Sequence, residues 1–189
     1  MLCTWSKHFE LVRIPAIQHS NGAVGCKQSH LLACRQSEGP CVVMEDDSTP
    51  TEWFSMEYVH EAMRLHSHWS YINMGPFLDV RPAWNRVSRL SETCSKLFLN
   101  STYSHQTHFI MYNEQSLRLV SEALSSRYPL DVYLGIHPHW VPTHVLATQT
   151  ESRSDIHPAH PMSSQWYSTS EKMASSFLKK PVDTIQDSR

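Results

Sequence analysis

The feature that most constrains this chain is a short apolar run, residues 41–44 (C-V-V-M), that ends abruptly in the carboxylates Glu45, Asp46 and Asp47. Short continuous apolar runs are typical of central strands that are buried on both faces of a sheet. Ligands of open α/β sheets lie outside the carboxyl ends of such strands. Three adjacent carboxylates repel one another, so in a cleft they need a compensating cation, and their hard oxygens suit Mg²⁺ or Mn²⁺. The alternative interpretation is a solvated acidic turn that caps the next helix.

The residues on either side of this run alternate between strand-like and helix-like patterns. A capping box at residues 49–52 (T-P-T-E) predicts a helix directly after the triplet, with Trp53, Val59 and Met63 among its core residues. The other predicted elements are strands at 9–14, 41–44, 69–74, 96–99, 108–112 and 141–147, helices at 22–37 and 113–126, and a loop at 77–95. This order predicts an α/β sandwich with a largely parallel central sheet.

Length and composition narrow the class of protein. The 189 residues, 40% hydrophobic and 18% charged, suit one globular domain at residues 1–162, followed by a polar, poorly ordered tail at 163–189. A formal net charge of −2 gives no reason to expect a nucleic-acid partner. We find neither a membrane-spanning run nor a secretory signal, so we expect a cytoplasmic protein, or one of a secretory lumen if a segment before Met1 is missing. The five cysteines lack C-x-x-C spacing, which predicts reduced core thiols.

Four motifs follow one another in a fixed order. They are residues 22–30 (G-A-V-G-C-K-Q-S-H), residues 42–47 (V-V-M-E-D-D), residues 128–134 (Y-P-L-D-V-Y-L), and Gln149 with residues 154–156 (S-D-I). Together they resemble glycosyltransferase family 25, the lipopolysaccharide-type and collagen-type galactosyl- and glucosyltransferases. Members of that family begin with a further strand and loop that carry Asn-Leu and paired Arg residues. Only residues 2–5 stand in that place here, so we expect this N-terminal βα unit to be missing or shortened.

The resemblance implies a GT-A type, Rossmann-like fold and a metal-assisted, inverting transfer of galactose or glucose. The expected donor is a nucleotide-diphosphate sugar, a uridine-diphosphate hexose in the first instance, and the expected cofactor is Mn²⁺ or Mg²⁺. The acceptor would be a glycan, a lipid-linked saccharide or a protein hydroxyl group. An inverting transfer needs a base that takes the proton of the attacking hydroxyl group.

The resemblance also suggests roles on the donor side. Asp47 is the first candidate for the metal contact, with Asp46 beside it, and Glu45 or Asp46 would bind ribose or sugar hydroxyl groups. Ser29 and His30 lie about two turns into their predicted helix, so they do not cap it. We expect them to contact the donor, His30 either at the diphosphate or by orienting a carboxylate. The alternative for His30 is a hydrogen-bonded core histidine.

Three further residues are candidates on the acceptor and C-terminal sides. Asp131 would act as the general base or contact the acceptor hydroxyl group, and the alternative is an N-cap. Asp155 and His157 would complete the metal site, and His157 can also be a surface imidazole. Gly22 and Gly25 are expected to let their helix pack closely on the sheet.

Two other functions remain open at this stage. One is a non-catalytic, glycosyltransferase-like module that has lost its first βα unit and binds a sugar or a partner. The other is a metal-dependent hydrolase or nuclease that uses Asp46 and Asp47. The latter predicts carboxylates at further strand ends, whereas the predicted strand ending at Met74 is followed by Gly75 and Pro76.

Overall fold

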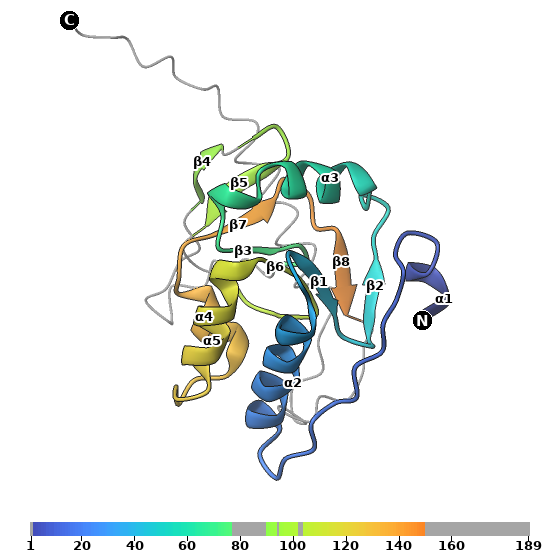
Figure 1. Cartoon of the computed structure of the whole chain (residues 1–189). Coiled ribbons are helices and arrows are strands. Elements are labelled where there is room, and N and C mark those ends of the chain that lie inside the picture. The colour runs from blue at the N-terminus through green and yellow to red at the C-terminus, as the bar shows by residue number, and fades with distance from the viewer. Residues whose placement is uncertain (1, 77–89, 94, 102–103, 150–189) are drawn as a thin grey trace, which may run out of the picture.

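The computed structural model describes residues 2–76, 90–93, 95–101 and 104–149, which fold around a six-stranded sheet (Figure 1). The helices are α1 (Leu2–Trp5), α2 (Gly22–Gln36), α3 (Met56–Arg64), the 3₁₀ helix η1 (His66–His68), α4 (Glu114–Ala123) and α5 (Leu130–Gly135). The strands are β1 (Cys41–Met44), β2 (Ser48–Pro50), β3 (Tyr71–Asn73), β4 (Leu90–Thr93), β5 (Phe98–Ser101), β6 (Phe109–Tyr112), β7 (His139–Pro142) and β8 (Ala147–Gln149). The predicted tail lies outside the described residues.

The strands of the large sheet follow the order β1-β6-β3-β7-β5-β4. Only β3 and β7 are parallel neighbours among the described strands, because the other pairs are all antiparallel. The mixed α/β class is confirmed, but the prediction of a mostly parallel sheet is wrong. The reason is β6, which inserts between β1 and β3 and runs against both. β1 and β3 therefore point the same way, as strands joined by a crossover helix do, yet they hydrogen-bond to β6.

One face of the sheet is covered by α2, α4 and α5 (Figure 1). Leu31 of α2, Val120 of α4 and Leu134 of α5 belong to one buried cluster with Tyr71 and Tyr112 of the sheet. These side chains are at most 4% exposed. The cluster fixes the position of α2 against the strands, and α2 carries the candidate residues Ser29 and His30.

The opposite face is covered by α1, α3 and the two-stranded β2–β8 sheet. Trp5 of α1 and Ala62 of α3 join a second cluster that contains Phe109 and Met111 of β6. Successive β6 side chains thus enter opposite clusters, as the two-residue period of a strand requires. The prediction that residues 41–44 form a central strand buried on both faces is wrong, because β1 is a half-buried edge strand among the described residues. The interior strand beside it, β6, is buried along its whole length.

The predicted helix starts agree with the structure at α2 and differ from it at α3. α2 begins as predicted, with Asn21 as the N-cap whose side chain accepts the Ala23 N–H. The helix predicted after the triplet is present as α3, but its predicted start at the capping box of residues 49–52 is wrong, because residues 48–50 pair with β8 instead. α3 starts at Met56, after the N-cap Ser55.

Three other predicted features also need correction. Trp53 and Met63 are 46% and 41% exposed, so the α3 core face differs from the expected one. Residues 9–14 form no strand and run as an irregular segment. The predicted strand at 141–147 is divided in the structure, because β7 ends at Pro142 and β8 begins at Ala147.

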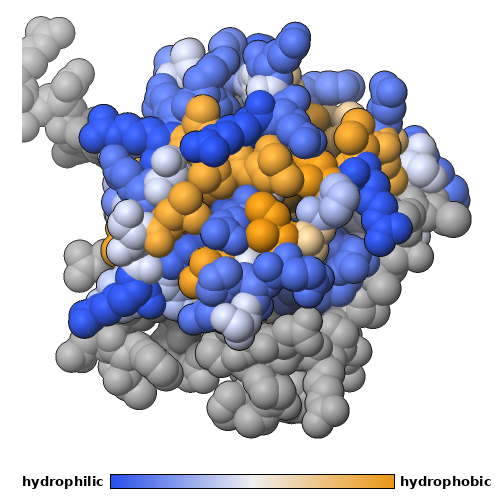
Figure 2. Space-filling view, turned by 60° about the horizontal axis from the view of Figure 1, so that its bottom comes forward, coloured by the Kyte–Doolittle hydropathy of each residue, from blue (hydrophilic) through white to orange (hydrophobic). Residues whose placement is uncertain are grey.

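The surface of the described part is not uniformly polar. Figure 2 shows hydrophobic residues gathered in a band across one otherwise hydrophilic face. Val12, in the irregular segment before α2, is 78% exposed, and Leu124 and Ile136 near the ends of α4 and α5 are 38% and 40% exposed.

Candidate functional site

The three carboxylates lie at the carboxyl end of β1, and their environments differ. Glu45 and Asp47 are half-buried, whereas Asp46 between them is exposed. The Glu45 N–H donates to the carbonyl of His108, which continues the β1–β6 ladder past the strand end. The Ser48 N–H donates back to the Glu45 carbonyl, so the triplet forms a tight turn between β1 and β2. No helix follows this turn, which removes the helix-cap interpretation of the triplet.

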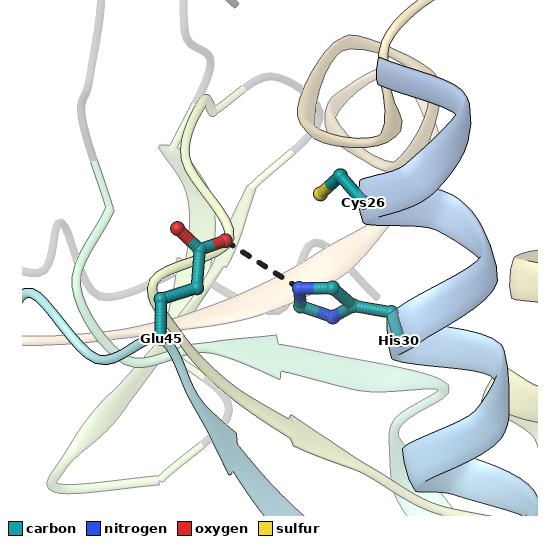
Figure 3. Close-up of side chains that lie close together, drawn as sticks. All are labelled: Cys26, His30 and Glu45. Carbon is teal, nitrogen blue, oxygen red and sulfur yellow. Dashed lines mark ion pairs between the residues drawn. The ribbon is translucent and has the colours of Figure 1, made fainter. Parts of the chain in front are cut away.

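His30 projects from α2 toward Glu45, as Figure 3 shows. Its Nε2 lies 3.4 Å from Glu45 Oε1, and its Nδ1 lies 3.0 Å from the hydroxyl group of Tyr112 on β6. Burial opposes the charge on His30, but hydrogen bonds to Cys26 and Glu45 outweigh it and raise its pKa to about 10. Burial also opposes the charge on Glu45, yet His30 holds the Glu45 pKa below its usual value. Of the two expected roles of His30, this geometry matches the orientation of a carboxylate.

Two other side chains hold the carboxylates in place. The Thr107 hydroxyl group donates to Glu45 Oε1 at 2.7 Å. The amide of Gln149, at the end of β8, lies 3.3 Å from Glu45 Oε2 and 3.2 Å from Asp47 Oδ2. Gln149 therefore connects the two half-buried carboxylates.

The pKa of Asp47 is shifted in the opposite direction from that of Glu45. Burial, followed by the neighbouring charges of Glu45 and Asp46, raises its pKa to about 6, although Gln149 acts in the opposite direction. Like charges raise a carboxyl pKa because a second negative charge is unfavourable nearby. A bound cation would relieve this repulsion, and carboxylate oxygens such as those of Asp46 and Asp47 are the ligands that Mn²⁺ and Mg²⁺ prefer.

Residues 104–108 connect the carboxylates to the rest of the candidate site. Gln106 has a φ of 75°, the only positive value among the described residues other than glycine. Such backbone conformations are strained for side chains with a Cβ and often occur at functional sites. Asn73, at the end of β3, stabilises this conformation, since its amide donates to the carbonyls of His105 and Gln106 at 2.8 and 3.0 Å. Asn73 is 3% exposed, and its Oδ1 has no hydrogen-bond partner among the described residues.

Asp131 lies on the other side of the same segment, in the first turn of α5. Its Oδ2 is 3.8 Å from Nδ1 of His105, and its side chain is 32% exposed. The N-cap of α5 is Pro129, and no side chain caps the helix. The N-cap alternative for Asp131 is therefore wrong, and its carboxylate is accessible.

Two glycines allow other elements to approach residues 104–108 closely. A Cβ on Gly75 would lie 2.4 Å from Nε2 of His108 and 2.7 Å from the carbonyl oxygen of Ala147. A Cβ on Gly135 would lie 2.0 Å from the carbonyl oxygen of Ser104. Contacts shorter than about 3 Å are incompatible with a side-chain carbon, so glycine is required at both positions for packing.

Ser29 and Gly25 have contacts that differ from the expected ones. The Ser29 hydroxyl group accepts the Ile17 N–H and donates to the Gly25 carbonyl, both at 2.9 Å. A Cβ on Gly25 would meet the Ile17 carbonyl oxygen at 2.7 Å. Both residues thus bind the irregular segment before α2, so the prediction that Gly25 packs on the sheet is wrong. The candidate ligands Asp155 and His157 lie outside the described residues.

Several residues of the site carried no recognisable signal in the sequence. Thr107 and His105 lie in an irregular segment, and Asn73 precedes the glycine and proline that end its strand. Cys26 did have a signal, because residues four apart on a helix share one face, and Cys26 precedes His30 by four. In the structure Cys26 joins His30 and Glu45 in one cluster of possible ligand atoms.

Comparisons with protein-family models, curated protein sequences and solved structures found no match for this chain. None of the helices in the described ranges has the length and apolar character that crossing a membrane requires. The function must therefore be argued from the site itself.

Proposed function

We propose that this chain is a nucleotide-sugar-dependent hexosyltransferase that transfers galactose or glucose to a hydroxyl group with inversion. The observation that carries the proposal is the connection made by residues 104–108, where Thr107 binds Glu45 and His105 faces Asp131. Glu45, suited to binding a donor, and Asp131, suited to binding an acceptor, thus lie on two sides of residues 104–108. A metal-dependent hydrolase is less well supported, because β3 ends in the amide Asn73 instead of a further carboxylate.

The donor side consists of the triplet and the groups that hold it. Asp47, with Asp46, would hold the divalent cation, and the cation when bound neutralises charge that develops on the leaving diphosphate. Glu45 is kept in position by His30, Thr107 and Gln149. In the described part of the chain its Oε2 accepts a hydrogen bond from Gln149, and a carboxylate oxygen can accept a further one from a ribose or sugar hydroxyl group.

Asp131 is the proposed base on the acceptor side. The acceptor hydroxyl oxygen forms a bond to the anomeric carbon while the bond from that carbon to the diphosphate oxygen breaks, and the hydroxyl proton passes to the Asp131 carboxylate. The partial exposure of Asp131 leaves it accessible to an acceptor. A GT-A type arrangement and a glycan, lipid-linked saccharide or protein acceptor remain part of this proposal.

The first experiment measures release of the nucleoside diphosphate from a panel of uridine-diphosphate hexoses, with and without Mn²⁺, using the full chain. We expect Mn²⁺-dependent release that Asp47→Ala reduces by about 100-fold or more, as loss of a main electrostatic group does. Glu10→Ala is the matched control, because Glu10 is an exposed acid in the irregular segment, and its activity should be unchanged. Failure of every donor to bind in the presence of Mn²⁺ would contradict the transferase proposal.

The second variant separates binding from transfer. Asp131→Asn should bind the donor with unchanged affinity and lose transfer to the acceptor, since the amide cannot accept the proton. Lost donor binding in this variant contradicts the role of Asp131 as the base. Donor binding by the unaltered chain without any transfer would instead favour the non-catalytic, sugar-binding module.

A further inference from the structure

Three potential metal-ligand atoms meet between α2 and the end of β1 (Figure 3). They are the Cys26 thiol, an imidazole nitrogen of His30 and a carboxylate oxygen of Glu45, and all lie within 4.8 Å of one another. Cys26 and His30 share one face of α2 because they are four residues apart. Glu45 approaches from β1, which packs against that helix. The cluster therefore joins two elements that are adjacent both in sequence and in space.

The separation of His30 and Glu45 is informative about what this cluster can hold. Hydrogen bonds between an N–H group and a carboxylate are usually about 2.7–2.9 Å long when charged. The 3.4 Å between Nε2 of His30 and Oε1 of Glu45 is longer than that. Two ligand atoms at about 2.0–2.1 Å from a tetrahedral zinc ion lie roughly 3.3–3.4 Å apart. The pair thus has the spacing of two zinc ligands without any movement.

The groups around the cluster also match those of a metal site. A ligating histidine usually has its other ring nitrogen fixed by a hydrogen bond, and a ligating carboxylate is hydrogen-bonded as well. Nδ1 of His30 meets the Tyr112 hydroxyl group at 3.0 Å, which leaves Nε2 to face Glu45. Thr107 and Gln149 hold the two oxygens of Glu45. His30 is 4% exposed, so its ring is fixed by packing too.

We infer that Cys26, His30 and Glu45 bind one zinc ion, with the fourth tetrahedral position open to water. A mixed sulfur, nitrogen and oxygen donor set suits Zn²⁺ or Co²⁺, whereas Mg²⁺ and Mn²⁺ prefer oxygen ligands. The site shares no ligand with Asp46 and Asp47 and does not depend on the transferase proposal. On binding, the Cys26 thiol and the protonated His30 ring each release one proton, so that a thiolate and a neutral imidazole nitrogen face the ion. The bound ion fixes α2 to the end of β1, so zinc should raise the melting temperature of the chain.

The experiment uses Co²⁺ as a spectroscopic probe in the metal-free, reduced full chain. We expect a thiolate-to-cobalt charge-transfer band and the visible bands of tetrahedral cobalt, saturating at one equivalent and displaced by Zn²⁺. Excess Mn²⁺ should leave the bands in place.

Cys26→Ser should abolish the charge-transfer band. The matched control is Cys34→Ser combined with Cys41→Ser, because these half-buried thiols lie at the far end of α2 and at the start of β1. The control should keep the band.

A second variant, Glu45→Gln, tests the site independently in case Cys26→Ser does not fold. Circular dichroism checks the folding of each variant. Glu45→Gln keeps the shape of the side chain and should weaken Co²⁺ binding by about tenfold or more, as perturbed metal sites do. The inference is overturned by the absence of the band in the unaltered chain, by its persistence in Cys26→Ser, or by its loss in the control. Unchanged Co²⁺ affinity in Glu45→Gln overturns it as well.

Discussion

The first and last residues of the triplet, Glu45 and Asp47, differ in acidity because they face different surroundings. Glu45 is turned toward His30 and Thr107, and His30 holds its pKa below the usual value. Asp47 lies beside two other carboxylates, and burial together with the charges of Glu45 and Asp46 raises its pKa to about 6. The fold thus stabilises the charged form of Glu45 and destabilises the charged form of Asp47.

This difference predicts that Asp47 reduces the stability of the metal-free chain above pH 6. The ordinary pKa of Asp is 3.8, so between about pH 4 and pH 6 the folded chain binds more protons than the unfolded one. The free energy of unfolding therefore falls as the pH rises through this window. Asp47→Asn should raise the free energy of unfolding at pH 7.5 by about 1 kcal/mol, a value reduced from the full shift because solvent screens a partly exposed group.

Urea unfolding of both chains without divalent ions, at pH 7.5 and pH 3.5, measures this effect. The gain should be present at pH 7.5 and nearly absent at pH 3.5, where Asp47 is mostly protonated in both the folded and the unfolded chain. A variant that is no more stable than the unaltered chain at pH 7.5 would contradict the assigned acidity of Asp47. Added Mn²⁺ should stabilise the unaltered chain but not Asp47→Asn, because Asp47 is proposed to bind the cation.

At the scale of elements, the strand ends are brought together by close backbone approaches. Gly75 follows β3 and lies against His108 before β6 and against Ala147 of β8. Asn73, two residues earlier, holds the conformation of residues 104–108. The end of β3 therefore supports the segment that joins Glu45 to Asp131.

We expect Gly75→Ala to lower the free energy of unfolding by about 1–3 kcal/mol, as overpacking of a filled site does. The added Cβ would lie 2.7 Å from the Ala147 carbonyl oxygen, a backbone atom that cannot rotate away. Gly39→Ala is the matched control, because a Cβ there meets nothing within 4 Å, and its effect should stay within about 0.5 kcal/mol. Equal effects of the two substitutions in chemical denaturation would show that the contact at Gly75 is not close.

At the scale of the whole molecule, the sheet has an open edge along β1 in the described part of the chain. Hydrogen-bonded residues alternate along an antiparallel pair. Because the Glu45 N–H donates to His108, the Val43 N–H also points toward β6, and the N–H groups of Val42 and Met44 point toward the open side. Val42 and Val43 pack against opposite apolar clusters, a pattern more typical of an interior strand.

Amide hydrogen exchange tests whether this edge is open in solution. The Val42 and Met44 amides should exchange about 100-fold faster than the Val43 amide, if local opening at Val43 costs about 3 kcal/mol. Residue-resolved exchange by nuclear magnetic resonance measures the ratio. Similar protection of the Val42 and Val43 amides would mean that a further strand covers the edge. If the protection of the Val42 amide rises with protein concentration, that strand belongs to a second copy of the chain.

Local signals in the sequence determined several elements and the place of the triplet. Asn21 marks the start of α2, the apolar residues of β1, β3 and β6 form strands, and the triplet follows β1 as predicted. These features depend on propensity, capping and apolar patterning within a few residues, so they can be recognised without knowing the fold.

Tertiary structure alone decided which strands are neighbours and which side chains meet. Residues 49–52 carry a helix-start signal, yet residues 48–50 form a strand because they pair with residues 147–149. The insertion of β6 between β1 and β3 brings Thr107 to Glu45, and the return of the chain through β8 brings Gln149 there. These partners are separated by 62 and 104 residues. Contacts over such distances depend on the pairing of whole strands, and no short sequence pattern encodes that pairing.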